Sequence, residues 1–87
     1  MKDMFHIKIE LLSKLVRRNC WKNKHTSFDN LQKSFPKHLR KDVKNAAKEL
    51  IKEGYILQKP TGYGLEISLN SRKMGEILRV AEKSYKE

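Results

Sequence analysis

PKHLRKDVKNAAKELIKEGYILQKPTGYGLEISL, residues 36–69, contains two hydrophobic periods that change at Gly54. Before this glycine the apolar residues recur at the spacing of a helix, and they are Leu39, Val43, Ala46, Ala47, Leu50 and Ile51. The two neighbouring alanines permit close approach of another helix. Gly54 suits the left-handed position that ends a helix. The pattern therefore predicts a helix over 36–53, starting at about Pro36 or Leu39.

After the glycine the hydrophobic period falls to two. The segment YILQK is strand-like, and Leu65, Ile67 and Leu69 alternate with polar or small residues, which is typical of a half-buried strand. The turn between them, PTGYG at 60–64, contains one proline and two glycines. The sequence predicts a two-stranded hairpin over 55–69. Its apolar face must pack on helices, because an isolated hairpin is marginal in water.

Two helices are predicted before this stretch. The first runs over 5–19 with an apolar stripe of Phe5, Ile9, Leu11, Leu12, Leu15 and Val16. The second runs over 27–34, where Thr26 and Asp29 have the spacing of a capping box. Pro36 cannot donate a hydrogen bond to the second helix and suits the first turn of the third.

A last helix is predicted over 71–84, with Met74, Ile77, Leu78, Ala81 and Tyr85 on its apolar face. The predicted fold class is α+β, mainly α, in a single domain covering 1–87. Three N-terminal helices, a two-stranded hairpin and a C-terminal helix resemble a winged helix-turn-helix, with the hairpin as the wing.

The charge of the chain favours a polyanionic partner. The net charge is +10 over 87 residues, and 37–53 contains six basic and three acidic residues. Such a charge attracts phosphate groups, although lysine also serves solubility alone. No apolar run approaches the roughly 20 residues that span a bilayer. The single cysteine, Cys20, and the lack of an export signal predict a cytoplasmic protein.

The polar side of the third predicted helix forms a basic ridge. Its candidate DNA-binding residues are Lys37, His38, Arg40, Lys41, Lys44, Asn45 and Lys48. Because the N-terminal half of a recognition helix enters the major groove, these residues are expected near bases and phosphates. Asn45 and Arg40 suit adenine and guanine edges, and the lysines suit phosphates. Alternatively, the ridge is only a solvated helix face.

Two further contacts are predicted outside that helix. At the hairpin tip, Lys59 and Thr61 are candidates for phosphate contact, and Tyr63 for a sugar or the minor groove. Alternatively, Tyr63 packs back on the hairpin. Thr26 and Ser27 head the second helix and either bind a phosphate or only cap it.

Catalysis is not predicted. His6, His25 and His38 lie in different segments, and each has a carboxylate four residues later, which supplies only two of the ligands that a zinc site needs. Cys20 lies near the end of an apolar stripe and is expected in the core. The sequence predicts no catalytic residue, no metal site and no cofactor.

Residues 25–80 resemble small archaeal winged-helix proteins of unassigned role. The resemblance rests on FPKHLR, on KELIKEGYI at the helix end and on the hairpin KPTGYGLEISLN, with Val43, Leu50 and Gly54 in the spacing of a winged-helix recognition helix. It implies a winged-helix fold and, by analogy, DNA binding.

Three functions remain open from the sequence. The leading hypothesis is a double-stranded DNA-binding transcriptional regulator, and the others are an RNA-binding module and a protein-interaction winged helix without nucleic acid. A homodimer is expected to use the first and last helices. Exposure of Phe5, Ile9, Trp21 or Tyr85 would support it.

Overall fold

A computed structural model describes the backbone of residues 4–85 and the side chains of residues 4–82. Its elements are α1 (Met4–Arg17), β1 (Thr26–Ser27), α2 (Phe28–Lys33), α3 (Arg40–Lys52), β2 (Ile56–Thr61), β3 (Gly64–Leu69) and α4 (Met74–Tyr85). Two one-turn 3-10 helices, η1 (Lys37–Leu39) and η2 (Ser71–Lys73), precede α3 and α4. The described chain is thus α+β and mainly helical, and the hairpin of β2 and β3 is confirmed.

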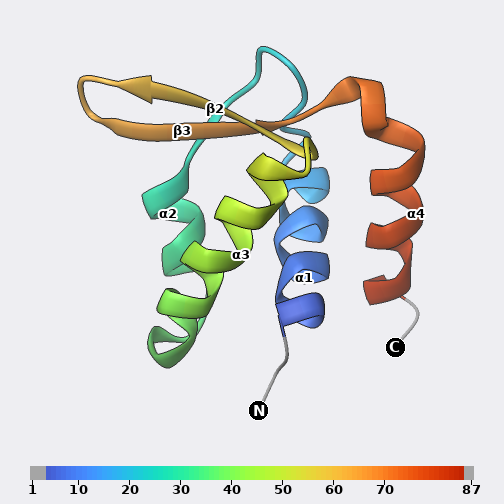
Figure 1. The fold of residues 1–87 in the computed structure, drawn as a ribbon, viewed down its shortest axis with the longest axis horizontal. Coiled ribbons are helices and arrows are strands. Elements are labelled where there is room, and N and C mark those ends of the chain that lie inside the picture. Colours follow the sequence, from blue (N-terminus) through green and yellow to red (C-terminus); the bar gives the residue numbers. More distant parts are fainter. Residues whose placement is uncertain (1–3, 86–87) are drawn as a thin grey trace.

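The helices stand side by side beneath a projecting hairpin (Figure 1). Helix α1 lies between α3 and α4 and packs against both. The hairpin crosses one end of the helices and extends over α2 and α3, whereas α4 lies on the opposite side of α1. The start of α1 and the end of α4 lie at the end of the helices remote from the hairpin. The hairpin tip is therefore distant from α4.

The sheet has a strand that the sequence prediction missed. Strand β1 pairs antiparallel with β3, with Thr26 opposite Ile67 and Ser27 opposite Glu66. The strand order is β1-β3-β2, so β3 is central. The prediction of two strands is therefore wrong in number. A two-residue strand carries no alternating pattern, and its pairing depends on a segment some forty positions later.

Strand β3 is covered on both faces at its C-terminal end, not on one face as predicted. Ile67 and Leu69 are buried as expected, but Ser68 is buried as well. The Ser68 hydroxyl donates to the carbonyl oxygen of Lys22 at 2.9 Å, and the N–H of Lys22 donates to the carbonyl oxygen of Leu69 at 3.1 Å. The segment after α1 thus lies over the second face of the sheet.

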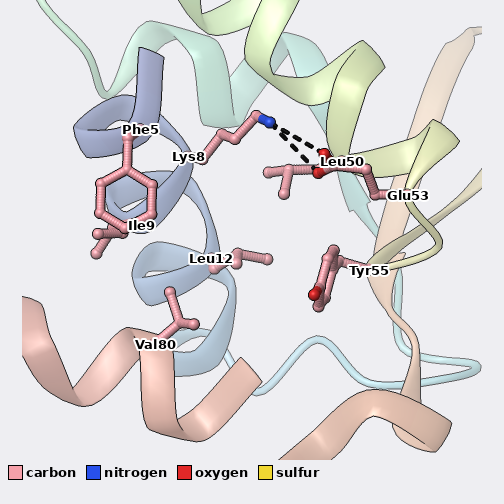
Figure 2. Close-up of a pocket in the computed structure, with 8 residues that line it drawn as sticks. All are labelled: Phe5, Lys8, Ile9, Leu12, Leu50, Glu53, Tyr55 and Val80. Carbon is pink, nitrogen blue, oxygen red and sulfur yellow. Dashed lines mark hydrogen bonds and ion pairs between the residues drawn. The ribbon is translucent and has the colours of Figure 1, made fainter. Parts of the chain in front are cut away.

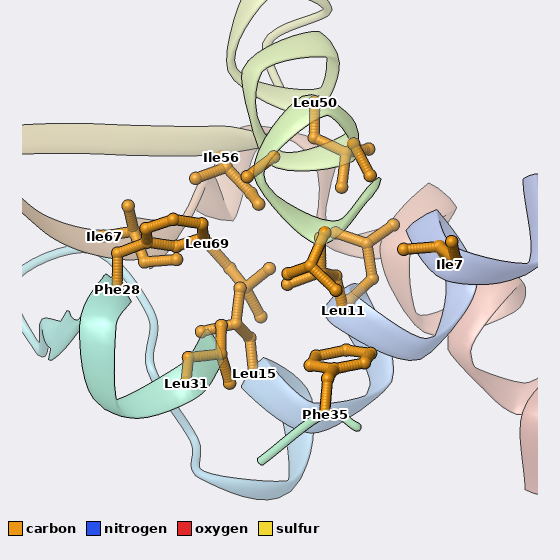
Figure 3. Packing of buried hydrophobic residues seen from close by; sticks show 14 of the residues in the cluster. Ile7, Leu11, Leu15, Phe28, Leu31, Phe35, Leu50, Ile56, Ile67 and Leu69 are labelled. Carbon is orange, nitrogen blue, oxygen red and sulfur yellow. The ribbon is translucent and has the colours of Figure 1, made fainter. Parts of the chain in front are cut away.

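The core is one cluster in which α1 is buried on several sides. Figure 3 shows side chains from α1, α2, α3 and the sheet converging. Phe5 of the predicted stripe is 57% exposed, and Ile7 is buried instead. The stripe is otherwise correct for Ile9, Leu11, Leu12 and Leu15, which are all buried. Because α1 contacts α3, α4 and β3, its buried surface is wider than a single stripe.

Helix α4 buries only part of its predicted apolar face. Ile77 and Ala81 are buried against the core side, whereas Met74 and Leu78 are 40% and 43% exposed. The side chain of Tyr85 lies outside the described residues. The predicted stripe was therefore too wide, because among the long helices α4 packs mainly on α1.

The ends of the helices differ from prediction by a few residues. The third helix does not run continuously from Pro36, because Pro36 is extended, with ψ 144°, and a 3-10 turn precedes α3. Gly54 has φ 87° directly after α3, as its sequence position predicts. Helix α1 ends at Arg17, and Asn19 adopts φ 54°, a conformation that asparagine tolerates better than most residues.

Candidate nucleic-acid interface

Five lysines on η1 and α3 form one exposed surface, here called the lysine face: Lys37, Lys41, Lys44, Lys48 and Lys52. Asn45 is exposed among them, and His38 is exposed on η1. The opposite side of α3 is buried, with Val43, Ala46, Ala47 and Leu50 in the core. The predicted ridge therefore lies in solvent along the whole helix. Lys52 belongs to this face by its spacing, although it was not among the predicted site residues.

Two acids at the C-terminal end of α3 face α1, whereas the third, Asp42, is partly exposed in the first turn of α3. Glu49 and Glu53 both pair with Lys8 of α1, whose Nζ lies 2.8 Å from Glu49 Oε1 and 3.3 Å from Glu53 Oε1. Figure 2 shows the contact between Lys8 and Glu53. Only 18% of the Lys8 side chain is exposed, so this cation is held at the helix interface. Lys8 thus offsets part of the negative charge of Glu49 and Glu53, and sequence reasoning missed this contact.

The ion pairs also affect Lys8 itself. A hydrogen bond to Glu49 raises the pKa of Lys8 above its ordinary 10.5, burial lowers it, and Glu53 raises it further. Because the pKa is raised in the folded state, the stabilisation is complete below pH 10.5. It is lost as the pH rises through the folded-state pKa.

Replacing this cation tests the pairing. We expect Lys8→Met to lower the free energy of unfolding by at most about 1 kcal/mol at neutral pH, because the two carboxylates are half exposed and screened. In urea titrations, the difference in free energy of unfolding between Lys8→Met and wild type should become smaller above pH 10.5. Lys24→Met, an exposed control, should show no such narrowing. If the loss of unfolding free energy in Lys8→Met stays the same at all pH values, the ion pairs of Lys8 with Glu49 and Glu53 are contradicted.

Arg40 differs from the lysines. Its side chain is only partly exposed, and Nε is buried without a hydrogen-bond partner among the residues that the structure describes. Its carbonyl oxygen accepts from Gln32 Nε2 of α2 at 3.1 Å, which links the start of α3 to α2. Arg40 therefore lies at the edge of the lysine face. The hydrogen bond of its carbonyl oxygen and its buried Nε distinguish Arg40 from the exposed lysines.

The tip of the β2–β3 hairpin is a tight, hydrogen-bonded turn. Thr61 Oγ1 donates to the carbonyl oxygen of Gly64 at 2.7 Å and accepts from the N–H of Tyr63 at 3.1 Å. The predicted phosphate donor is thus engaged within the turn. The Tyr63 side chain is 103% exposed, so the alternative that it packs back on the hairpin is wrong. Lys59 is exposed and lies opposite Glu66 in the sheet register.

Thr26 and Ser27 have separate structural roles. The N–H of Asn30 donates to Ser27 Oγ at 3.4 Å, so Ser27, not the predicted Thr26, caps α2. Thr26 pairs in β1, and its hydroxyl accepts from Arg18 at 3.5 Å. Both residues are therefore explained by local structure.

A groove of about 460 Å³ lies between α1, the end of α3 and α4 (Figure 2). Its lining residues are Phe5, Lys8, Ile9, Leu12, Leu50, Glu53, Tyr55 and Val80. Of the side chains named for a dimer, Phe5 is exposed, Ile9 is buried and Trp21 is partly buried against the core. The predicted dimer surface is thus smaller than its apolar stripes suggested.

Cys20 is buried, and burial raises the pKa of its thiol. Within the described part of the chain, no three His, Cys, Asp or Glu side chains are grouped as metal ligands would be. None of the described helices has the length and apolar character needed to cross a membrane. Comparisons of the chain with protein-family models, with curated proteins and with solved structures gave no match.

Proposed function

We propose that this chain is a winged-helix protein that binds double-stranded DNA, with α3 as the recognition helix and the β2–β3 hairpin as the wing. The element order supports this proposal. The short helix α2 and the basic helix α3 precede the hairpin, and Gly54 separates α3 from the hairpin. Strand β1 pairs with the central strand β3.

The observation that carries the proposal is the separation of charge on α3. Five lysines and Asn45 occupy the exposed side of η1 and α3, whereas two of the three acids in 37–53, Glu49 and Glu53, pair with Lys8 of α1. Solubility alone does not require this separation, because a helix surface with positive and negative charges interspersed is equally soluble. A surface for phosphates requires the separation, since a nearby carboxylate repels them.

The mechanism follows from the shape of α3. An α-helix fits the major groove of B-form DNA, where the amide of Asn45 has the donor and acceptor that adenine requires. The lysines contact phosphates on both sides and fix the register of the helix. A-form RNA has a major groove that is too deep and narrow for such a helix, which favours DNA over double-stranded RNA.

The number of phosphate contacts can be measured from the salt dependence of binding. We expect Lys48→Gln to weaken binding to all duplexes alike and to lower the slope of log K against log salt by about one unit. Arg79→Gln, an exposed change on α4, should leave the slope unchanged. Fluorescence anisotropy from 50 to 300 mM salt gives both slopes. Equal salt slopes for Lys48→Gln and wild type would mean that Lys48 does not contact a phosphate.

Selection from randomised pools tests the kind of nucleic acid. Tagged protein is mixed with random duplex DNA and random RNA in equal amounts, and the recovered strands are sequenced. Recovery of duplex DNA with an enriched short motif is the expected result for a sequence-specific regulator. Preferential recovery of RNA contradicts duplex DNA binding, and recovery of neither contradicts the proposed function.

A further inference from the structure

The fully exposed ring of Tyr63 lies at the outermost point of the hairpin. At 103% exposure, the side chain is as open to solvent as in an extended peptide. The hairpin itself extends past α2 and α3 (Figure 1). An aromatic side chain so placed has its whole apolar surface available to a partner.

The turn that carries Tyr63 is held in one conformation. Thr61 Oγ1 bonds to both the N–H of Tyr63 and the carbonyl oxygen of Gly64, and Thr61 and Gly64 form the last pair of the ladder. Gly64 has φ 128°, which explains a glycine at this position. Little backbone entropy therefore remains to be lost when the tip meets a partner.

Gly62, on the other side of Tyr63, is not explained by the fold. Its φ lies outside the left-handed region, and an added Cβ would meet no atom within 4 Å. The free protein thus has no steric or conformational need for glycine at 62. A glycine at 62 would be needed if another molecule came close to the backbone beside the Tyr63 ring.

The tip has little charge with which to attract a phosphate. Lys59 and Glu66 are the charged residues of 56–69, and they lie directly opposite each other in the sheet. In contrast to α3, the hairpin tip therefore offers an aromatic face and an open backbone. Its contribution to binding is expected to depend weakly on salt.

We propose that Tyr63 stacks on an unpaired nucleobase next to a duplex held by α3, so that the preferred substrates are DNA ends, forks and bulges. This inference rests on the proposed function. Within a continuous duplex both faces of every base are covered by its neighbours. A flat ring finds a free π-face only where a base is unstacked, and stacking there is tolerant of sequence. Gly62 leaves room for that base to approach the turn.

A fork-shaped DNA and a hairpin-capped duplex of the same stem test this inference. Anisotropy at 150 mM salt measures both affinities, and 2-aminopurine at the fork reports stacking by its fluorescence. We expect Tyr63→Ala to weaken fork binding about tenfold and to weaken binding to the capped duplex by a clearly smaller factor. Tyr63→Phe, which keeps the ring, should retain fork binding and quenching. Gly62→Val should behave as Tyr63→Ala.

The outcomes separate the two proposals. Equal affinities of wild type for both DNAs, or a Tyr63→Ala protein with unchanged fork affinity and quenching, overturn the stacking inference and leave duplex binding by α3 intact. Failure of wild type to bind either DNA at 50 mM salt overturns the proposed function itself. Since Tyr63 and Gly62 contact nothing in the core, circular dichroism melts of the variants should match wild type.

Discussion

Reversing two lysines of the lysine face, Lys41→Glu with Lys44→Glu, is expected to abolish binding to duplex DNA. Both side chains are exposed in the N-terminal half of α3, which enters the groove in the proposed complex. The change removes two phosphate contacts and adds two repulsions, so we expect a loss of about 100-fold or more at 50 mM salt. Because neither residue is in the core, the free energy of unfolding should change by no more than about 0.5 kcal/mol.

A matched variant separates position from total charge. Arg72→Glu with Arg79→Glu changes the net charge by the same amount at exposed sites on η2 and α4, and α4 lies on the opposite side of α1 from α3. Its affinity for duplex DNA should fall only a few-fold, through the long-range field. Gel shifts of both variants at low salt make the comparison. Equal losses in the two variants would mean that net charge, not α3, determines binding.

The largest effect on stability is expected at Leu11. This side chain is fully buried at the centre of α1, where it meets the core residues of Figure 3. Leu11→Ala removes buried methyl groups and leaves a cavity, which costs about 2–5 kcal/mol. That is a large part of the about 4–13 kcal/mol expected for a domain of this length. The variant should lose its cooperative transition or melt far below wild type.

Phe5→Ala is the control on the same helix. The ring is 57% exposed, so its removal should lower the free energy of unfolding by less than about 1 kcal/mol despite the larger side chain. Urea titration followed by circular dichroism measures both variants. Comparable destabilisation by the two changes would contradict the burial of α1 described above.

The elements of residues 36–69 could be predicted because their causes are local. The period change at Gly54, the turn at 60–64 and the exposure of Lys41, Lys44 and Lys48 each follow from neighbouring residues. Strand β1 could not be predicted, because two residues have no period and their partner is β3. The burial of Ser68 depends likewise on a hydrogen bond to Lys22, 46 positions away.

Packing partners decided the remaining differences. Sequence periodicity selects an apolar stripe but not how many neighbours cover it, so Phe5 was expected inside and Ile7 was overlooked. Lys8 was not foreseen as the partner of Glu53, which lies 45 positions later. Two acids four residues apart on one flank of α3 were a usable signal that some cation covers them. The open space around Gly62 depends on the three-dimensional fold and could not be predicted from the sequence.

Chemical-shift mapping on isotope-labelled protein, titrated with a 16-base-pair duplex at 50 mM salt, tests most directly whether α3 binds DNA. The expected result is that the amide shifts concentrate on η1, α3 and the hairpin tip, residues 37–52 and 59–64, with small changes on α4. Shifts concentrated on α1 and α4, or no shifts at millimolar DNA, would contradict binding through the lysine face.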